Sequence, residues 1–592
     1  MQNTEHIERL RQAMNAHGIA AVVIPTDDPH SSEYVCDRFK AREHFSGFTG
    51  SAGTLAVTAG KAALWTDSRY FLQAVMQLEG SGIELMKLGV DTTPTLNKWI
   101  CANVTKGQTV AIPAELFPTS MMNSLKTALR DYAIDGESDI IGESWADRPP
   151  MPCTKAFVHE EKYAGETAAA KIARLKTFYP SDCTLIISAL DEIAWLFNIR
   201  GNDVEYNPVT YSYAIITPEE SLLFIDSKKM TAEVKAHCER NGIKVQEYDD
   251  FERHINGMSG MKVLMDKDST NAHIFDTAAK NNRVFFMQSP VSKMKAAKNE
   301  TQIAGTRLAM EKDGAALVRF WMWLENALAT GDKVTEISAA EKLHDFRAEL
   351  PEFAGESFST IAGYGAHGAI VHYSATKETD TEIKYGSLLL VDSGAQFPHG
   401  TTDITRTFAL GNISDIARRD FTLVLKGHIA LASAVFPAGT AGYNLDTLAK
   451  QYLWKYGLDY GHGTGHGVGH FLCVHEGPQN ISPRTNSAPL IPGMITSDEP
   501  GYYKAGEYGI RHENLTLVVE KDIKGSEKQF LGFEVLTLCP FDISGMDITL
   551  LTTEERTWLN NYHDTVLRRL SPMLNNEEQA WLANKCRHII SK

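Results

Sequence analysis

The stretch LLLVDSGAQFPHGTTDITRTF, residues 388–408, decides the fold of the last third of this chain. Two apolar runs flank a short turn at Phe397–Gly400. Asp392 ends the first run and Asp403 opens the second. Because the strands of a hairpin run antiparallel, this pattern predicts that both carboxylates lie at one end of a sheet.

Three later segments each carry one further candidate metal ligand. In GHGTGHGVGHFLCVHEG, residues 461–477, glycines alternate with histidines around His466. MITSDEPGYY carries Glu499 just before a proline turn, and GIRHENLTLVV carries Glu513. With the hairpin aspartates they make four carboxylates and one imidazole, without a thiolate. This hard donor set favours a paired Mn²⁺, Co²⁺, Zn²⁺ or Fe²⁺ site over a structural zinc site, and so indicates a metallohydrolase.

Each candidate ligand also has an ordinary structural explanation. An aspartate in a sequence such as DSG usually forms a turn, and a glutamate before proline is usually solvated. The glycine–histidine segment is less easily explained in this way, because it has neither helical nor strand periodicity and little side-chain volume to pack. No single one of the five residues therefore indicates a metal site. Their occurrence together does.

That combination is found in a known family. The motifs VDSGAQF, GTTDITRT, HGTGHGVG, VHEGP, SDEPGYY and GIRHEN resemble those of the pita-bread metallopeptidases, the group of aminopeptidase P, prolidase and methionine aminopeptidase. Within the group the chain is most similar to the long, cytosolic Xaa-Pro aminopeptidases. TDDPHSSEY, FSGFTGSAGT and WTDSRYFLQA near the N-terminus, KMKAAKNETQIAG, and TEERTWLNNYH near the C-terminus extend the resemblance over essentially the whole chain.

The resemblance implies a role for each candidate ligand. Asp392 would hold one divalent ion, His466 and Glu499 the other, and Asp403 and Glu513 would bridge the two. Mn²⁺ is the expected metal, with Co²⁺, Zn²⁺ and Fe²⁺ as alternatives. A water shared by the two ions would supply hydroxide near neutral pH, and Glu499 would accept its proton.

The same resemblance implies further residues that act on the substrate. His475 and His372 are the expected donors to the tetrahedral intermediate. His462 is similar to a pocket histidine that contacts substrate, and Arg69 to an N-terminal arginine that reaches towards it. Arg511, two residues from a bridging ligand, would orient that ligand beside the substrate.

One position departs from the family pattern. His512 stands where relatives carry an apolar residue. If Arg511 and Glu513 point into the site from a strand, His512 faces the other way. We therefore expect a packing or surface residue rather than a sixth ligand.

The expected reaction is removal of the N-terminal residue from peptides with proline in second position. An Xaa-Pro bond has no N–H and its ring fixes φ, so a general aminopeptidase fits it badly. Two alternatives remain open from sequence. One is a prolidase of the same fold, which cleaves Xaa-Pro dipeptides; the other is a binding or scaffold protein that keeps the fold without catalysis.

Composition agrees with a soluble globular enzyme and limits the partners it can have. The chain has 592 residues, of which 43% are hydrophobic and 22% charged, so several domains are expected. A net charge of −16 argues against nucleic acid or an anionic membrane as the main partner. The eight cysteines are scattered without a CxxC pair, the N-terminus is a polar amphipathic helix, and no apolar run reaches about 18 residues. A cytoplasmic location is expected.

The fold class predicted is α/β (α+β), in four parts. Residues 1–150 and 151–300 are expected to be two creatinase N-terminal-like α/β domains, separated by the proline-rich DRPPMPCT. They read as weak copies, with Thr49 and Ser51 matching Thr210 and Ser212 at a spacing of 161, and Asp67 matching Asp226 at 159. Residues 301–540 would form the pita-bread catalytic domain, and 541–592 a helical extension that helps to build a homodimer.

Overall fold

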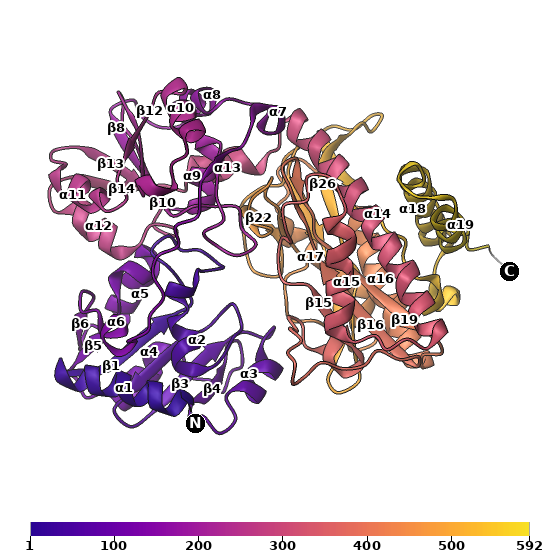
Figure 1. Ribbon diagram of the computed structural model, residues 1–592, viewed down its shortest axis with the longest axis horizontal. Helices are drawn as coiled ribbons and strands as arrows, with labels where there is room; N and C mark the ends of the chain where they lie inside the picture. The colour runs from indigo at the N-terminus through magenta and orange to yellow at the C-terminus, as the bar shows by residue number, and fades with distance from the viewer. Residues whose placement is uncertain (1, 591–592) are drawn as a thin grey trace. The chain divides into compact units, whose positions relative to one another are not determined.

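The computed structural model describes residues 2–590 and resolves them into two compact units (Figure 1). The first unit comprises residues up to 161 together with 166–292. The second comprises 162–165 together with the residues from 293 onward. The predicted boundaries at 150, 300 and 540 stay predictions.

The first unit contains two six-stranded sheets of the same topology. The strand order of one is β4-β3-β2-β1-β5-β6 and that of the other is β12-β11-β10-β8-β13-β14. In each sheet three neighbouring strands, β3-β2-β1 or β11-β10-β8, form an antiparallel meander. The other pairs of neighbouring strands are parallel. The strands are β1 (Ile19–Pro25), β2 (Thr54–Thr58), β3 (Ala62–Thr66), β4 (Glu84–Lys87), β5 (Thr109–Ala111), β6 (Ala133–Asp135), β8 (Cys183–Ile187), β10 (Ser212–Ile216), β11 (Ser221–Ile225), β12 (Ile243–Gln246), β13 (Lys262–Met265) and β14 (Arg283–Phe286).

Helices connect these strands in both halves of the first unit. They are α1 (Gln2–Ala16), α2 (Ala41–Ser46), α3 (Phe71–Gln77), α4 (Leu96–Asn103), α5 (Thr119–Ala128), α6 (Ile140–Ser144), α8 (Ala168–Leu175), α9 (Leu190–Phe197), α10 (Ala232–Arg240), α11 (Asp250–Gly257) and α12 (Ala272–Ala279).

The repeat predicted from sequence is present, with one correction to its register. The hairpin pairs Val57↔Ala62 and Ile216↔Ser221 lie 159 residues apart, and the spacing also fits Asp67 with Asp226, which directly follow β3 and β11. The match of Thr49 and Ser51 to Thr210 and Ser212, at a spacing of 161, is wrong. Because the two hairpins have loops of equal length, a single spacing of 159 residues relates their strands. That spacing aligns Ser51 with Thr210 instead.

The second unit holds the predicted aspartate hairpin between long helices. In Figure 1, α14 (Glu300–Thr330) and α15 (Glu336–Ala348) run beside a three-stranded sheet of order β15-β16-β19. A second sheet has the order β20-β27-β26-β23-β21-β22. The strands are β15 (Ile361–Tyr364), β16 (Ser387–Ser393), β19 (Ile404–Leu410), β20 (Val435–Pro437), β21 (Gly465–Gly467), β22 (Glu476–Ile481), β23 (Ile495–Asp498), β26 (Asn514–Lys521) and β27 (Phe530–Val535).

Long helices precede and follow the aspartate hairpin in this unit. α14 begins with a capping box between Asn299 and Gln302. It ends before Gly331, whose φ of 80° is a left-handed conformation that glycine adopts without steric strain. α16 (Asp415–Ala432) follows the hairpin, and α17 (Asp446–Trp454) leads into the histidine segment. The fold is therefore the mixed α/β class predicted.

The C-terminal extension forms part of the core of the second unit. Its helices are α18 (Thr553–Leu570) and α19 (Asn576–Lys585), as predicted. Leu559 and Val566 are fully buried in one hydrophobic cluster with Phe421 and Leu425 of α16. The extension therefore supports the catalytic domain, and its role in a dimer stays a prediction.

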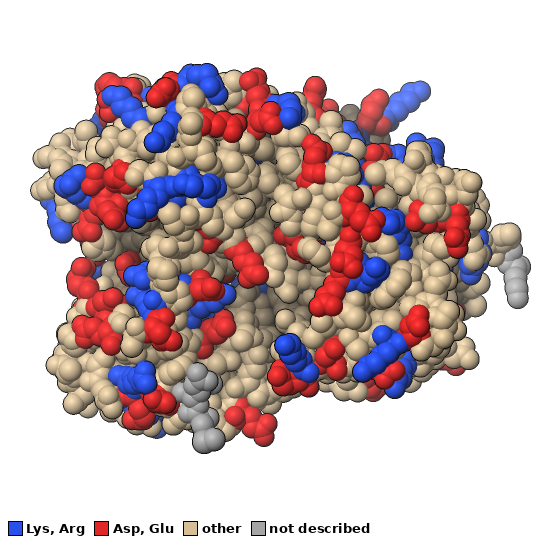
Figure 2. All heavy atoms as spheres, viewed as in Figure 1, with Lys and Arg blue, Asp and Glu red and all other residues tan. Residues whose placement is uncertain are grey.

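The exposed surface is of mixed charge. Acidic and basic side chains are interspersed over the face shown in Figure 2. Among residues 2–590, no helix combines the length and hydrophobicity needed to cross a bilayer.

We predict that Leu559→Ala destabilises the second unit by about 2–5 kcal/mol, because it opens a cavity where the side chain is 0% exposed. Pulse proteolysis in urea measures the change. Ile548→Ala, at a position that is 37% exposed, is the control and should stay within about 0.5 kcal/mol. Equal effects of the two variants would contradict packing of the extension into the core.

Candidate metal centre

The aspartate hairpin has the predicted form. β16 and β19 are antiparallel, with Asp392 opposite Thr405, and Asp403 directly precedes β19. The two carboxylates therefore lie at the same end of the hairpin. The turn between the strands contains a further short antiparallel pair, β17 (Gln396–Phe397) with β18 (Gly400–Thr401).

The other three candidate ligands come from neighbouring strands of the six-stranded sheet. His466 lies in β21, Glu499 follows β23 and Glu513 precedes β26. The Glu499 amide donates to Thr464 O at 2.8 Å, and the Glu513 amide donates to Thr405 O at 3.1 Å. The second bond ties this sheet to the aspartate hairpin.

These elements bring the predicted ligands together. His466 Nε2 lies 3.4 Å from Asp403 Oδ2 and 3.3 Å from Glu499 Oε1. One ligand atom from each of Asp403, His466 and Glu513 lies within 4.8 Å of the others. Separate segments of the chain thus supply one compact group of metal-binding atoms.

The protonation of His466 also suits a metal ligand. Its Nδ1 lies 3.0 Å from the Gly467 carbonyl, which can only accept a hydrogen bond. Nδ1 therefore donates to that carbonyl, and Nε2 is the nitrogen that faces the carboxylates and is left for a metal ion.

The carboxylates oppose one another's ionisation. Burial raises the pKa of Glu499 to about 7. Burial, followed by the charges of Asp403, Glu499 and Asp392, raises the pKa of Glu513 well above its usual value. Burial alone would lower the pKa of His466, but its hydrogen bond to Asp403 and the charge of Glu499 raise it to about 9.

This arrangement fits divalent cations. Asp392 Oδ1 is buried and has no hydrogen-bond partner among the described residues. A buried polar atom without a partner is costly unless something else binds it. A cation would satisfy that oxygen and offset the repulsion among the acids, so the donor set fits the expected metal site.

A second layer of side chains holds the ligands, and sequence analysis missed most of it. Arg511 Nη2 donates to Asp392 Oδ2 at 2.5 Å, and its Nε donates to Thr405 Oγ1 at 3.1 Å. Thr405 Oγ1 in turn donates to Glu513 Oε2 at 2.7 Å. Arg511 thus reaches Asp392 directly and the expected bridging ligand Glu513 only through Thr405. The alternation in DIT could have indicated Thr405, since residues two apart share a strand face.

Tyr503 is another residue that sequence analysis missed, although the motif SDEPGYY contains it. It lies in β24 (Gly501–Lys504), which pairs with β25 (Tyr508–Arg511). Its hydroxyl accepts from Arg511 Nη1 at 2.7 Å and lies 2.8 Å from His462 Nε2. Tyr503 therefore links the candidate substrate histidine His462 to the second layer of the metal site.

The remaining predicted site residues differ in how closely they join the cluster. The ring of His475 packs edge-on against His466, with centroids 4.3 Å apart. His372 lies in the irregular segment after β15, directly after Val371, whose carbonyl accepts from Arg511 Nη1 at 3.4 Å. Arg69 lies in the other compact unit, where it forms two hydrogen bonds to Asp67, at 2.9 and 2.7 Å.

His512 faces away from the cluster, as expected, and is a packing residue rather than a surface one. It is 0% exposed, and its ring meets Phe421 edge-on with centroids 4.3 Å apart. Burial, together with the charges of Arg406 and His428, lowers its pKa well below the usual value. It therefore packs in the core as a neutral ring.

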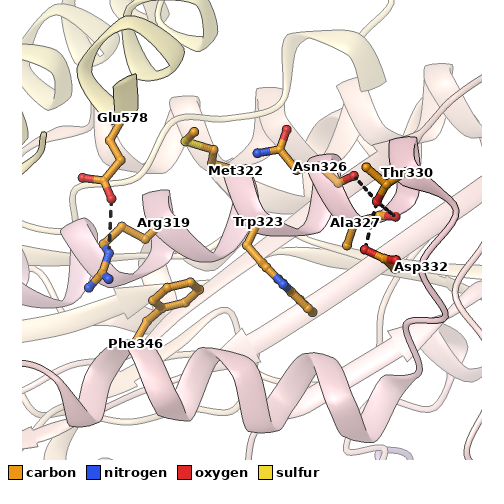
Figure 3. Close-up of a pocket in the computed structure, with 9 residues that line it drawn as sticks. All are labelled: Arg319, Met322, Trp323, Asn326, Ala327, Thr330, Asp332, Phe346 and Glu578. Carbon is orange, nitrogen blue, oxygen red and sulfur yellow. Dashed lines mark hydrogen bonds and ion pairs between the residues drawn. The ribbon is translucent and has the colours of Figure 1, made fainter. Parts of the chain in front are cut away.

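A separate groove lies on the second unit, along α14 (Figure 3). Its volume is about 360 Å³, and Arg319 in its wall pairs with Glu578 at 3.3 Å. None of the candidate site residues lines it. The lining residues are Arg319, Met322, Trp323, Asn326, Ala327, Thr330, Asp332, Phe346 and Glu578.

Comparison with known proteins identifies the family. The family model for metallopeptidase family M24 matches residues 304–520, and the one for its C-terminal region matches 529–589. A probable Xaa-Pro aminopeptidase P of Metarhizium robertsii is 41% identical over 99% of this chain and 99% of its own. The chain belongs to metallopeptidase family M24.

Further comparisons extend over the whole of this M24 metallopeptidase. The creatinase/prolidase N-terminal domain matches it twice, at residues 6–141 and 147–302. Aminopeptidase P2 of Arabidopsis thaliana is 41% identical over 97% of this chain and 86% of its own. An X-prolyl aminopeptidase of Caenorhabditis elegans, described as a cytosolic enzyme with a di-nuclear active site, matches with a TM-score of 0.96 at 34% identity, over 100% of both chains. The predicted architecture is confirmed, and the protein is a hydrolase.

We predict that Glu499 and His466 contribute stability to the metal-free protein that is lost as the pH rises. The pKa of Glu499 is raised from 4.5 to about 7 and that of His466 from 6.5 to about 9, so between pH 4.5 and 9 these two groups bind more protons in the folded state than in the unfolded state. Their contribution to the melting temperature in chelator should fall across this window.

Comparison with Glu499→Gln isolates the part that Glu499 contributes. Because glutamine does not titrate, the variant should lose less stability than the wild type between pH 4.5 and 7. Parallel curves for the two proteins would contradict the proposed coupling of Glu499 to the cluster.

Proposed function

We propose that this M24 metallopeptidase removes the N-terminal residue from peptides whose second residue is proline. The observation that carries the proposal is the convergence of His466 Nε2, Asp403 and Glu499 on one point, with Nδ1 of His466 already bound to a carbonyl. Similarity to Xaa-Pro aminopeptidases over the full chain supports the choice of substrate.

The five predicted ligands would hold two divalent ions. Asp392 would bind one ion, His466 and Glu499 the other, and Asp403 and Glu513 both. Mn²⁺ is the proposed metal, because a donor set dominated by carboxylates accepts it readily, and Co²⁺, Zn²⁺ and Fe²⁺ are alternatives. Two such ions would supply a hydroxide nucleophile near neutral pH.

Glu499 is the proposed acceptor of the proton from that water. Its Oε1 already accepts a hydrogen bond from Ser497 Oγ at 3.0 Å, and the same hydroxyl accepts from the His466 amide at 2.9 Å. These bonds orient the carboxylate before reaction. Its pKa of about 7 without metal shows how strongly the site resists a bare charge there.

Histidines beside the cluster would stabilise the developing oxyanion. His475 is suited to this role because its ring contacts that of His466. His372 is the second proposed donor, in a segment held by Arg511. His462, fixed by Tyr503, and Arg69 of the first unit are proposed to bind the substrate.

The acidic cluster also accounts for exopeptidase action. A free N-terminal amine carries a positive charge and is attracted to the carboxylates, whereas an internal peptide bond brings no such charge. Proline in second position would be accepted because its nitrogen offers no N–H that the site must satisfy.

We also propose that the protein is a cytoplasmic homodimer. Its proposed domains are residues 1–150, 151–300 and 301–540, followed by the extension at 541–592.

We predict that the Mn²⁺-loaded protein releases arginine from Arg-Pro-Pro but not from Arg-Ala-Pro. Glu499→Ala should lower kcat by about 10²–10⁴-fold, since it removes the proton acceptor. Glu507→Ala, an exposed glutamate in the loop after β24, is the control and should match the wild type. Cleavage of an Xaa-Pro dipeptide alone would identify a prolidase, and no cleavage of any substrate would favour a scaffold.

We predict that Glu513→Gln weakens Mn²⁺ binding by at least about 10-fold, because it removes a charged ligand that is 1% exposed. Titration calorimetry on chelator-treated protein measures the affinity. Glu520→Gln, an exposed position of the same strand β26, should bind as tightly as the wild type. Unchanged affinity in Glu513→Gln would exclude Glu513 as a ligand.

A further inference from the structure

Glu336 is a buried carboxylate that gathers hydrogen bonds from one long segment. It begins α15 and is 0% exposed. The Tyr364 amide donates to its Oε1 at 2.8 Å, and Tyr373 Oη donates to its Oε2 at 2.8 Å. The Thr381 amide donates to Oε2 at 3.2 Å, and His367 Nδ1 lies 2.9 Å from Oε2. Four donors and the N-terminus of a helix together stabilise the buried charge.

All four donors belong to residues 364–381, which comprise the last residue of β15 and most of its connection to β16. Apart from one short 3₁₀ turn, Gly365–Ala369, this connection has no regular secondary structure. A connection of this kind has many conformations open to it. Glu336 removes that freedom by binding the connection at its start, in its middle and near its end.

The connection carries His372, and the two chain neighbours of His372 are each held by a different residue. Tyr373 binds Glu336 through its hydroxyl and packs in a cluster with Ile361 and Ile370. The Val371 carbonyl accepts from Arg511 Nη1 at 3.4 Å. His372 is thus fixed between Glu336 and the arginine that also holds Asp392.

We propose that Glu336 is a positioning residue for His372. It acts at a distance, through Tyr373 and the backbone of residues 364–381, and touches neither the metal ligands nor the substrate. The proposal rests on the proposed function, in which His372 donates to the oxyanion. A donor to a transition state must be placed precisely, and a misplacement of 1 Å costs about 10²-fold in rate.

The primary test compares Glu336→Gln with Ser338→Ala in the Mn²⁺-loaded full-length protein. Glutamine keeps the size of the side chain, but its NH₂ group replaces one oxygen that accepts hydrogen bonds. The expected result is a loss in kcat of about 10- to 100-fold, with KM and Mn²⁺ affinity within 2-fold of the wild type. Ser338→Ala removes the partner of Thr335 in the capping box and leaves Glu336 in place, so its kcat should not change.

A double-mutant cycle with His372→Ala separates positioning from a general structural role. If Glu336 acts through His372, Glu336→Gln causes no further loss of kcat once His372 is alanine. Tyr373→Phe, which removes one of the four donors, should give a smaller loss that also disappears in the His372→Ala background. Equal fold-losses in both backgrounds, or no loss in Glu336→Gln, would overturn the proposal.

Hydrogen exchange measures the anchoring without relying on activity. Glu336→Gln should accelerate amide exchange in peptides that cover 364–381 and leave those from 461–475 unchanged. Unchanged exchange in 364–381 would also overturn the proposal. An inactive wild-type protein would refute the proposed function, whereas an active one with additive losses would refute the role of Glu336 alone.

Discussion

The repulsion among buried carboxylates is the constraint on which the second unit depends. Asp392, Asp403, Glu499 and Glu513 converge within one site; the first, second and fourth are more than nine-tenths buried, and the Glu499 side chain is 18% exposed. Such a group is unfavourable without opposing charge. Cations are proposed to supply most of that charge, and the protein contributes Arg511, which binds Asp392 from behind.

The protein keeps these acids in place by tying their backbones together. Asp498 and Asn514, which neighbour Glu499 and Glu513, are paired across β23 and β26. His428 connects the same two residues, with Nδ1 3.1 Å from Asp498 O and Nε2 3.0 Å from Asn514 Nδ2. Arg406 donates to Asn514 Oδ1 at 2.8 Å and to Tyr562 Oη of the C-terminal extension at 2.9 Å. The extension thereby supports the strands that carry the ligands.

Local patterns were sufficient to predict the hairpin, the helical C-terminal extension and the five candidate ligands, whose roles came from the resemblance. The repeat was recognised but misaligned at Thr210 and Ser212, because short polar tripeptides carry less information than hairpin registers. Thr405, Tyr503 and Glu336 were missed. Each acts through partners that lie far away in the chain, such as Glu513 for Thr405 and Tyr373 for Glu336.

The sequence by itself determined the element types, the repeated N-terminal domains and the donor chemistry, since these follow from periodicity, turn residues and ligand type. Only the tertiary structure decided which nitrogen of His466 faces the acids, which ligand Arg511 holds and what anchors the segment around His372. These are properties of hydrogen bonds between distant segments. Their geometry exists only once the sheets, the hairpin and α15 have packed together.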